Sequence, residues 1–291
     1  MSAEKSRQSQ IFLAGTPNSG KTSIFNRLTG LRQKVANYPG VTVERHSGIT
    51  QFQGKDYLIH DLPGCYSLYP VSADERVVLD SFLAQSREKK KELVVLVLNA
   101  SQLQRSLLLL SQIVDLGFPV IAALNMVDTA EDESKQINME RLKTMLEIPL
   151  VRINGRTGEG LDELMNLIST GDISLRSPFI SHSHYDSVTT RDVQEQVGLD
   201  NIYAASLLAC QHGKSVYIGT RQFLAMKEAG IFHPIRAEVE DKQERIVALK
   251  NLLKGVEERV GQERRLIDKV DAVLTHKLWG SIIFLAVLFL L

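Results

Sequence analysis

The amino-acid sequence predicts an α/β fold, in which a mainly parallel sheet is covered by helices on both faces, followed by a small all-α part. Apolar runs of strand length alternate with helix-competent stretches through residues 11–171. A glycine-rich turn joins the first run to the first helix, and after Gly171 apolar residues recur only at helical spacing. Strands alternating with helices form parallel sheets through right-handed crossovers. We therefore expect a tail at 1–10, an α/β domain at 11–171 and a helical domain at 172–276.

Composition places few limits on function. The chain has 291 residues, and its 34 lysines and arginines balance its 34 aspartates and glutamates, so the overall charge indicates no particular partner. Two cysteines, Cys65 and Cys210, lie far apart in sequence, which argues against a disulfide framework and fits a reducing compartment. Residues 1–10 are polar and lack the apolar core of a signal peptide.

A phosphate-binding loop is the first functional motif. Residues 15–22 read G-T-P-N-S-G-K-T and match the pattern G-x-x-x-x-G-K-S/T, between a predicted strand at 11–14 and a helix at 23–28. Such a loop points backbone N–H groups and a helix N-terminus at phosphate oxygens, whereas a chance glycine-rich turn is the alternative. Lys21 is expected to reach the β- and γ-phosphates, and Thr22 to hold Mg²⁺. The expected cradle consists of Gly15, Asn18, Ser19, Gly20, Lys21, Thr22 and Ser23.

A second nucleotide signature follows a predicted hairpin. Residues 35–44 are expected to form a loop with Pro39-Gly40 as its turn, and strands 46–52 and 57–60 follow it. The second strand ends in D-L-P-G at 61–64, which matches the D-x-x-G signature of G domains. Asp61 is expected to hold Mg²⁺ through water. The N–H of Gly64 is expected to sense the γ-phosphate, because glycine lets the peptide approach closely.

The rest of the predicted α/β domain places two further motifs at strand ends. We expect strands at 93–98, 120–124 and 150–153, and helices at 103–116, 137–146 and 161–168. Asn125-Met126-Val127-Asp128 follows one strand and Asn154-Gly155-Arg156 follows another. Ligands of such sheets bind beyond the carboxyl ends of the strands, where all these motifs fall.

The N-x-x-D motif favours guanine over adenine. The Asp128 carboxylate can accept hydrogen bonds from N1–H and the 2-amino group of guanine, whereas adenine would leave it unpaired at a cost. Asn125, Met126 and Asp128 are therefore expected to bind the base. Asn154, Gly155 and Arg156 stand where G domains usually carry Ser-Ala-Lys, and we expect the Gly155 N–H to meet the guanine O6.

The C-terminal part is predicted to be helical and to end at a membrane. Residues 246, 249, 253, 256 and 260 are apolar at helical spacing, and 172–277 carries fifteen basic and fifteen acidic residues, which argues against a nucleic-acid platform. Residues 281–291 are almost wholly apolar, although a membrane helix needs roughly 20 such residues. We expect 277–291 to begin a transmembrane helix, with a buried C-terminal helix or strand as the alternative. Lys269, His276 and Lys277 place the preceding chain on the cytoplasmic side.

Taken together, these motifs resemble one family. The segments V-A-N-Y-P-G-V-T-V-E at 35–44, D-L-P-G-C-Y-S-L at 61–68 and N-M-V-D at 125–128, with the helical tail, are similar to the N-terminal part of the ferrous iron transport protein B (FeoB) family. The resemblance is close in the G domain and loose between 177 and 261. It implies a Ras-like P-loop G domain that hydrolyses GTP, a helical domain that inhibits GDP release, and a membrane permease at the bacterial inner membrane. It also raises accessory Feo proteins and a homo-oligomer as candidate partners.

The resemblance also assigns roles to single residues. Thr42 matches the switch threonine on Mg²⁺ and the γ-phosphate. Asn18 matches an asparagine that places K⁺ in potassium-stimulated members, or else only ties the loop to the first switch. Cys65 stands where Ras carries its water-orienting glutamine, and a thiol positions water poorly. The expected catalytic set is therefore Asn18, Lys21, Thr42 and Gly64, with slow intrinsic hydrolysis.

Two other functions stay open at this point. A soluble assembly GTPase that binds RNA is one, and a nucleotide sensor with negligible hydrolysis is the other. His182, His184 and Asp186 are interpreted as a solvated polar loop rather than a metal site, and no iron ligand is assigned within this chain.

Overall fold

The structure is a computed structural model, and it describes residues 9–30, 33–38, 43–88, 90–132, 135–171, 173–211 and 233–259, with single residues at 273, 276, 280, 283 and 289. Its centre is a seven-stranded sheet in the order β2-β3-β4-β1-β5-β6-β8. The strands are β1 (Ser9–Gly15), β2 (Gln33–Asn37), β3 (Glu44–Phe52), β4 (Lys55–Asp61), β5 (Leu93–Asn99), β6 (Val120–Asn125) and β8 (Leu150–Arg152).

The sheet is parallel except at one edge, as the alternation of strands and helices predicts. β1 pairs in parallel with β4 and β5, and β6 pairs in parallel with β5 and β8. β2, β3 and β4 form an antiparallel meander, with the turn after Phe52 where the sequence predicts a hairpin. Helices bury both faces of the central strands, and β5 is accordingly apolar from Leu93 to Leu98.

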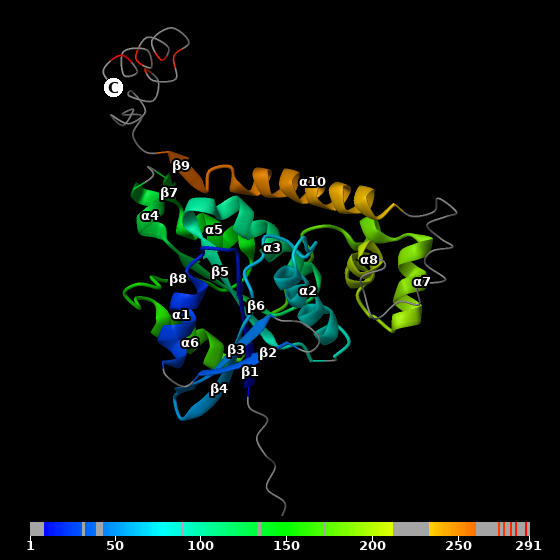
Figure 1. Ribbon diagram of the computed structural model, residues 1–291, viewed down its shortest axis with the longest axis horizontal. Helices are drawn as coiled ribbons and strands as arrows, with labels where there is room; N and C mark the ends of the chain where they lie inside the picture. Colours follow the sequence, from blue (N-terminus) through cyan, green and yellow to red (C-terminus); the bar gives the residue numbers. More distant parts are fainter. Residues whose placement is uncertain are drawn as a thin grey trace, which may run out of the picture.

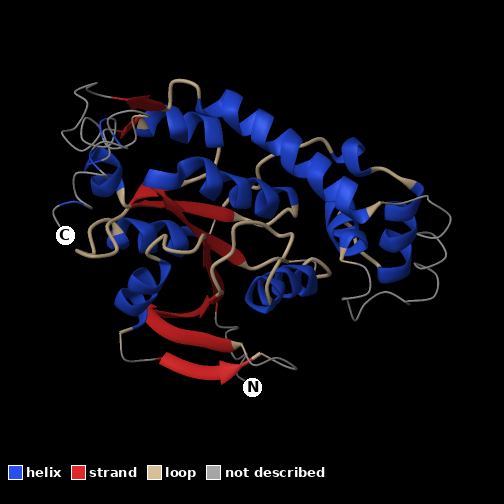
Figure 2. Ribbon diagram, turned by 45° about the horizontal axis from the view of Figure 1, so that its top comes forward, coloured by secondary structure: helices blue, strands red, loops and turns tan. Residues whose placement is uncertain are grey.

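In the described part of the chain, six helices belong to the α/β part and cover both faces of the sheet (Figure 2). They are α1 (Lys21–Thr29), α2 (Ala73–Gln85), α3 (Leu103–Asp115), α4 (Val127–Asp132), α5 (Met139–Leu146) and α6 (Leu161–Thr170). Side chains of one strand alternate between two cores: Val95 and Val97 pack with α1 and α6, whereas Leu96 and Leu98 pack with α2 and α3. The predicted α/β fold class is confirmed.

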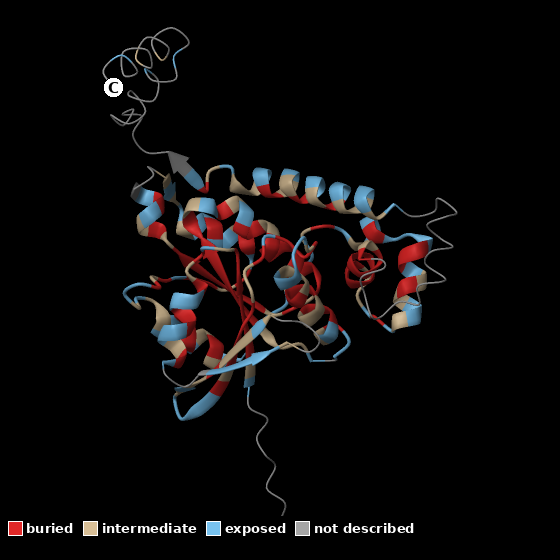
Figure 3. Ribbon diagram, viewed as in Figure 1, coloured by how far each residue is buried: buried red, intermediate tan, exposed pale blue. Residues whose placement is uncertain are grey.

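One of the remaining described helices, α10 (Pro234–Leu253), packs along α3 of the α/β part. A short 3₁₀ turn, η1 (Ala100–Gln102), precedes α3. A second one, η2 (His182–Tyr185), leads into the helical part, which contains α7 (Val188–Val197), α8 (Ile202–Cys210) and α10. α10 runs along α3 and α8 (Figure 1), with one side exposed and the other buried (Figure 3). Buried residues of α8 and α10 share one core cluster with α2 and α3, so no solvent layer separates the helical part from the α/β part.

Three of the described strands were not predicted. β2 occupies residues 33–37 and so overlaps the first residues of the expected loop at 35–44, whereas the predicted Pro39-Gly40 turn lies outside the described residues. β7 (Lys135–Ile137) pairs antiparallel with β9 (Glu257–Arg259), so the segment after α10 returns to the α/β part. The expected helix at 137–146 consequently begins at Met139, where the Asn138 side chain accepts a hydrogen bond from the Arg141 N–H at 2.9 Å.

The predicted apolar helical face continues only partly into the described structure. Leu249 is buried on α10, and Val256 is buried beyond the end of that helix. Residues 260–272 and most of 277–291 lie outside the described residues, so the predicted membrane segment is not described. Within the described part of the chain, no helix combines the length and apolar character needed to cross a membrane.

Candidate nucleotide-binding site

The phosphate loop connects the end of β1 to the start of α1. Its backbone curls because Asn18 and Gly20 both adopt left-handed conformations, with φ of 59° and 83°. The Ser19 N–H donates to the Thr16 carbonyl at 3.2 Å and closes the turn. A Cβ at Gly20 would lie 2.3 Å from Asn125 Nδ2, so this position excludes any side chain. At Gly20 the loop therefore presents only backbone to the space in front of α1.

Two adjoining hollows occupy the carboxyl edge of the sheet. The first, of about 520 Å³, is lined by residues 16–23, Gly64 and Met126. The second, of about 310 Å³, is lined by Gly20, Ser23, Asn125, Met126, Asp128, Thr129, Asn154, Gly155 and Arg156. They share Gly20, Ser23 and Met126, and together they have the size of a small-molecule site. The structure thus brings the phosphate-loop residues and the base-motif residues to one continuous site.

Lys21 and Asp61 form a buried ion pair between the first turn of α1 and the end of β4. Lys21 Nζ contacts Asp61 Oδ1, and each residue is 8% exposed. Burial raises the pKa of Asp61, while the neighbouring Lys21 charge and hydrogen bond oppose that rise. The carboxylate is held at the loop, where the D-x-x-G signature predicts it.

The D-x-x-G segment lies against the phosphate loop. The Leu62 N–H donates to the Leu13 carbonyl at 3.0 Å, and the Cys65 N–H to the Gly15 carbonyl at 3.2 Å. A Cβ at Gly64 would lie 3.1 Å from Pro17 backbone atoms. The Cys65 side chain is fully buried, and burial raises the pKa of its thiol far above the ordinary value. That side chain belongs to the core and not to the hollow.

Asn125 ties the two hollows together. Its Nδ2 donates to the Ser19 carbonyl at 2.8 Å, and its Oδ1 accepts from the Gly155 N–H at 3.0 Å. The N–H that was expected to meet guanine O6 is therefore paired with Asn125 in this structure. A base would meet this N–H by sharing or replacing that bond.

Asp128 and Asn154 organise the far end of the second hollow. Asp128 is half-exposed; its Oδ1 accepts from the Thr129 N–H at 2.9 Å, and its Oδ2 lies 3.6 Å from Arg156 Nη2. Asn154 Oδ1 accepts from the N–H groups of Arg156 and Thr157 at 2.9 and 3.0 Å. The asparagine thus caps the turn as a serine hydroxyl could, which explains how it replaces serine in this motif.

The motifs did not identify two supporting residues. Asn99 ends β5, is 4% exposed, and its Nδ2 lies 3.5 Å from the Asn18 carbonyl. Ser106 Oγ accepts from the Asn99 N–H at 3.0 Å and lies 3.5 Å from Thr16 Oγ1. Asn99 directly follows a predicted buried strand, and that position at the carboxyl edge is the signal that could have found it. Thr42 lies outside the described residues.

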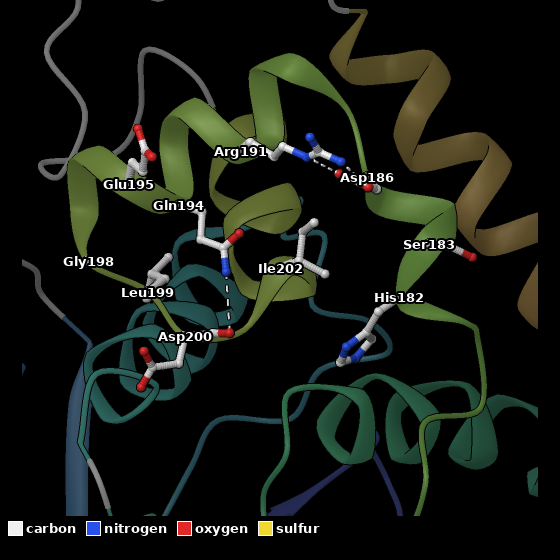
Figure 4. Close-up of a pocket in the computed structure, with 10 residues that line it drawn as sticks. All are labelled: His182, Ser183, Asp186, Arg191, Gln194, Glu195, Gly198, Leu199, Asp200 and Ile202. Atoms are coloured by element: carbon white, nitrogen blue, oxygen red, sulfur yellow. Dashed lines mark hydrogen bonds and ion pairs between the residues drawn. The ribbon is translucent and has the colours of Figure 1, made fainter.

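A third hollow, of about 700 Å³, lies in the helical part beside α7 and α8 (Figure 4). It is lined in part by His182 and Asp186, which belong to the predicted polar loop. Asp186 is paired with Arg191, and His184 Nδ1 lies 2.7 Å from Glu244 Oε2. Among the residues that the structure describes, no three His, Cys, Asp or Glu side chains are grouped as a metal site. This hollow contains no residue of the phosphate loop.

A curled phosphate loop, a D-x-x-G carboxylate beside it and an N-x-x-D motif at a parallel strand end define a P-loop G domain. Residues 9–168 match the family model described as ferrous iron transport protein B. The chain belongs to this family.

Relatives and solved structures agree with this assignment. The chain is 39% identical over 163 residues to the Fe(2+) transporter FeoB of Leptospira biflexa, covering 56% of this chain and 23% of that protein. It is 32% identical over 311 residues to an Fe(2+) transport protein A/Fe(2+) transporter FeoB fusion protein of Porphyromonas gingivalis, covering 97% of this chain and 36% of that one. The chain therefore spans about a quarter to a third of these proteins.

Two solved structures share the fold. The cytosolic domain of the T. maritima FeoB iron transporter in GMPPNP form has a TM-score of 0.67 at 28% identity and covers 86% of this chain and 100% of that one. A GDP-bound point mutant of the S. thermophilus FeoB G-domain has a TM-score of 0.69 at 29% identity, with the same coverage.

Proposed function

We propose that this chain is the GTP-binding and slowly GTP-hydrolysing regulatory part of a ferrous iron transporter. The observation that carries the proposal is the continuity of the two hollows, with Lys21 in one and Asp128 in the other. That arrangement fits a ligand with a polyphosphate at one end and a guanine at the other. The GDP and GMPPNP forms of the related structures support the same ligand. We keep the division into a G domain at 11–171 and a helical domain at 172–276.

The residues around α1 suit the phosphates and Mg²⁺. The loop N–H groups and Lys21 would bind the β- and γ-phosphates, in place of the present Lys21–Asp61 pairing. The exposed Thr22 hydroxyl and the Asp61 carboxylate supply the oxygen donors that Mg²⁺ prefers. When bound, Mg²⁺ neutralises charge on the β- and γ-phosphates. Thr42 is the third residue that we assign to it.

Hydrolysis is proposed to rest on the loop and on backbone groups. Cys65 faces the core, so the side chain that follows Gly64 does not orient the attacking water. The Gly64 N–H and the backbone near Thr42 would place that water, and Lys21 would stabilise charge on the γ-phosphate. The exposed Asn18 amide is proposed to hold K⁺ at the same phosphates. This division of roles implies slow turnover that K⁺ accelerates.

The whole protein is proposed to carry iron across a membrane and to have protein partners. The two relatives described above are named as Fe²⁺ transporters, and we propose the same cargo for the protein to which this chain belongs. The permease would follow this chain, with this part at the cytoplasmic face of the bacterial inner membrane. Small accessory Feo proteins and a second copy of the chain are proposed partners, and the fusion in Porphyromonas gingivalis supports the first of these.

Nucleotide titrations test the proposal. GDP and GMPPNP should bind the chain with Mg²⁺ far more tightly than ADP. The variant Asp128→Asn should lower GDP affinity about 100-fold, because the amide is uncharged and its single oxygen replaces two acceptors for N1–H and the 2-amino group. Glu131→Gln is the matched control, since it makes the same acid-to-amide change on α4 but outside both hollows. Equal affinities for GDP and ADP would contradict the proposal.

Turnover measurements separate an enzyme from a silent nucleotide sensor. GTP hydrolysis by the chain should be slow in Na⁺ and faster in K⁺, and Asn18→Ala should remove the difference. No turnover in either salt would favour the sensor.

A further inference from the structure

We infer that Arg27 of α1 is a positioning residue for guanine recognition, acting through the base loop, defined as residues 154–156. This inference rests on the proposed function, because it assigns a specificity role within the same site. No motif marks Arg27, which lies six residues after Lys21 on an otherwise ordinary helix. Its role follows from where its guanidinium lies and not from its sequence context.

The guanidinium of Arg27 spans two consecutive carbonyl groups of the base loop. Its Nε donates to the Gly155 carbonyl at 2.9 Å, and its Nη2 donates to the Arg156 carbonyl. Gly158 lies against the same group, since a Cβ there would be 3.2 Å from Arg27 Nη1. A planar fork with fixed donors suits two neighbouring acceptors, whereas the single ammonium of a lysine does not.

The base loop is therefore held from two sides. On its N–H side, the Gly155 N–H donates to Asn125 of the neighbouring strand end, while the Arg156 N–H donates to Asn154 within the loop and fixes its turn. On its other side, the carbonyl groups of Gly155 and Arg156 accept hydrogen bonds from Arg27 of α1. The Gly155 backbone also lies close to α1, since a Cβ there would be 3.2 Å from Ile24 Cγ1. The direction in which the Gly155 N–H points consequently depends on α1.

α1 thereby couples the two ends of the site. The helix begins with Lys21 and Thr22 at the phosphate hollow, and Arg27 lies about two turns further along. A nucleotide bound at both ends of the site would contact groups whose relative positions are set by this one helix. Removing the two Arg27 hydrogen bonds would let the base loop move without changing the phosphate cradle. The base-dependent part of affinity should fall while the phosphate-dependent part is kept.

Inosine nucleotides separate the role of Arg27 from that of Asp128. Inosine keeps the O6 and N1–H of guanine but lacks the 2-amino group, which is one of the two proposed partners of Asp128. If Arg27 acts through the base loop and O6, Arg27→Met should accelerate dissociation of GDP and IDP by the same factor, about three- to tenfold. Asp128→Asn should instead affect GDP more than IDP. Dissociation of inorganic tripolyphosphate should not change in Arg27→Met.

The experiment measures dissociation of fluorescent GDP and IDP from the full chain by displacement in a stopped-flow instrument. Arg191→Met is the matched control, because Arg191 also holds its partner Asp186 through two nitrogens but lies on α7. Arg27→Lys should fall between wild type and Arg27→Met, and it serves if the methionine variant does not fold. Wild-type rates in both Arg27 variants, or faster tripolyphosphate release, would overturn the inference. A wild-type chain without guanine preference would instead refute the proposed function.

Discussion

At the residue scale, the site depends on positions where a side chain cannot be accommodated. Gly20 has a positive φ and lies beside Asn125, whose amide links the phosphate loop to the base loop. We predict that Gly20→Ala lowers GDP affinity by at least about tenfold, because the new Cβ must displace the Asn125 amide. Gly171→Ala is the control: Gly171 also has a positive φ, but a Cβ there meets no atom within 4 Å. Equal GDP affinities in the two variants, measured by titration calorimetry, would contradict this account.

His60 gives the fold a specific response to acid. The residue is 3% exposed on β4, with its ring nitrogens 2.9 Å from Ser47 Oγ, 3.1 Å from Gln10 Oε1 and 3.1 Å from Arg45 Nη2. Burial, and then the Arg45 charge, lowers the pKa of His60 to about 4. Because the folded-state pKa lies below the unfolded value near 6.5, the neutral form stabilises the fold above about pH 6.5.

That stabilisation should be lost as the pH falls from about 6.5 toward 4, by on the order of 2–3 kcal/mol. Urea unfolding at several pH values in this window measures it. His60→Gln should flatten the pH dependence, whereas the exposed His233→Gln should keep it. Parallel curves for wild type and His60→Gln would show that other groups cause the acid response.

At the element scale, α2 begins with a capping arrangement beside the D-x-x-G segment. Ser72 Oγ accepts from the Glu75 N–H at 3.2 Å, while the Glu75 carboxylate accepts from the Val71 N–H at 2.9 Å. We predict that Ser72→Ala lowers the free energy of unfolding by about 1 kcal/mol, since one N–H of the first turn loses its partner. Ser169→Ala, at an exposed hydroxyl near the end of α6, should change it much less. Chemical denaturation of both variants checks the difference.

The elements also show what the sequence could and could not predict. Buried strands such as β5 and amphipathic helices such as α3 carry long patterns, so their positions are predicted within a residue or two. β7 and β9 have three residues each, too few for a two-residue alternation to show, and their pairing joins segments about 120 residues apart.

The residues of the nucleotide site also fall into those that the sequence could predict and those that it could not. Short motifs with fixed spacing predicted that Lys21, Asp61 and Asp128 lie at one edge, and the structure brings them there. Arg27 and Asn99 act through contacts with carbonyls 128 and 81 positions away, which no local pattern encodes. Supporting residues of this kind become visible only when the fold places them.

At the scale of the whole molecule, a buried polar cluster joins α10 to α3. Arg245 is fully buried and pairs with Asp115 at 2.8 Å and Asp241 at 2.9 Å, and its Nη2 donates to the Tyr185 hydroxyl at 2.8 Å. The guanidinium carbon also lies 4.6 Å from the centre of the Tyr203 ring. Burial raises the pKa of Asp115, which Arg245 and the N–H groups of residues 179 and 180 oppose. The two parts of the chain are thus joined by charge as well as by apolar contact.

We predict that Arg245→Met destabilises the chain by about 3–5 kcal/mol, because the carboxylates of Asp115 and Asp241 would remain buried without their cation. Adding Asp115→Asn should recover part of this loss, since it removes one of the two unpaired charges. Arg236→Met, which breaks an exposed pair with Glu240 on the same helix, should leave the melting temperature unchanged. Thermal and chemical unfolding of the four proteins measure these differences. If Arg245→Met unfolds like Arg236→Met, apolar packing alone joins α10 to α3, and the buried charges do not contribute to the stability of the chain.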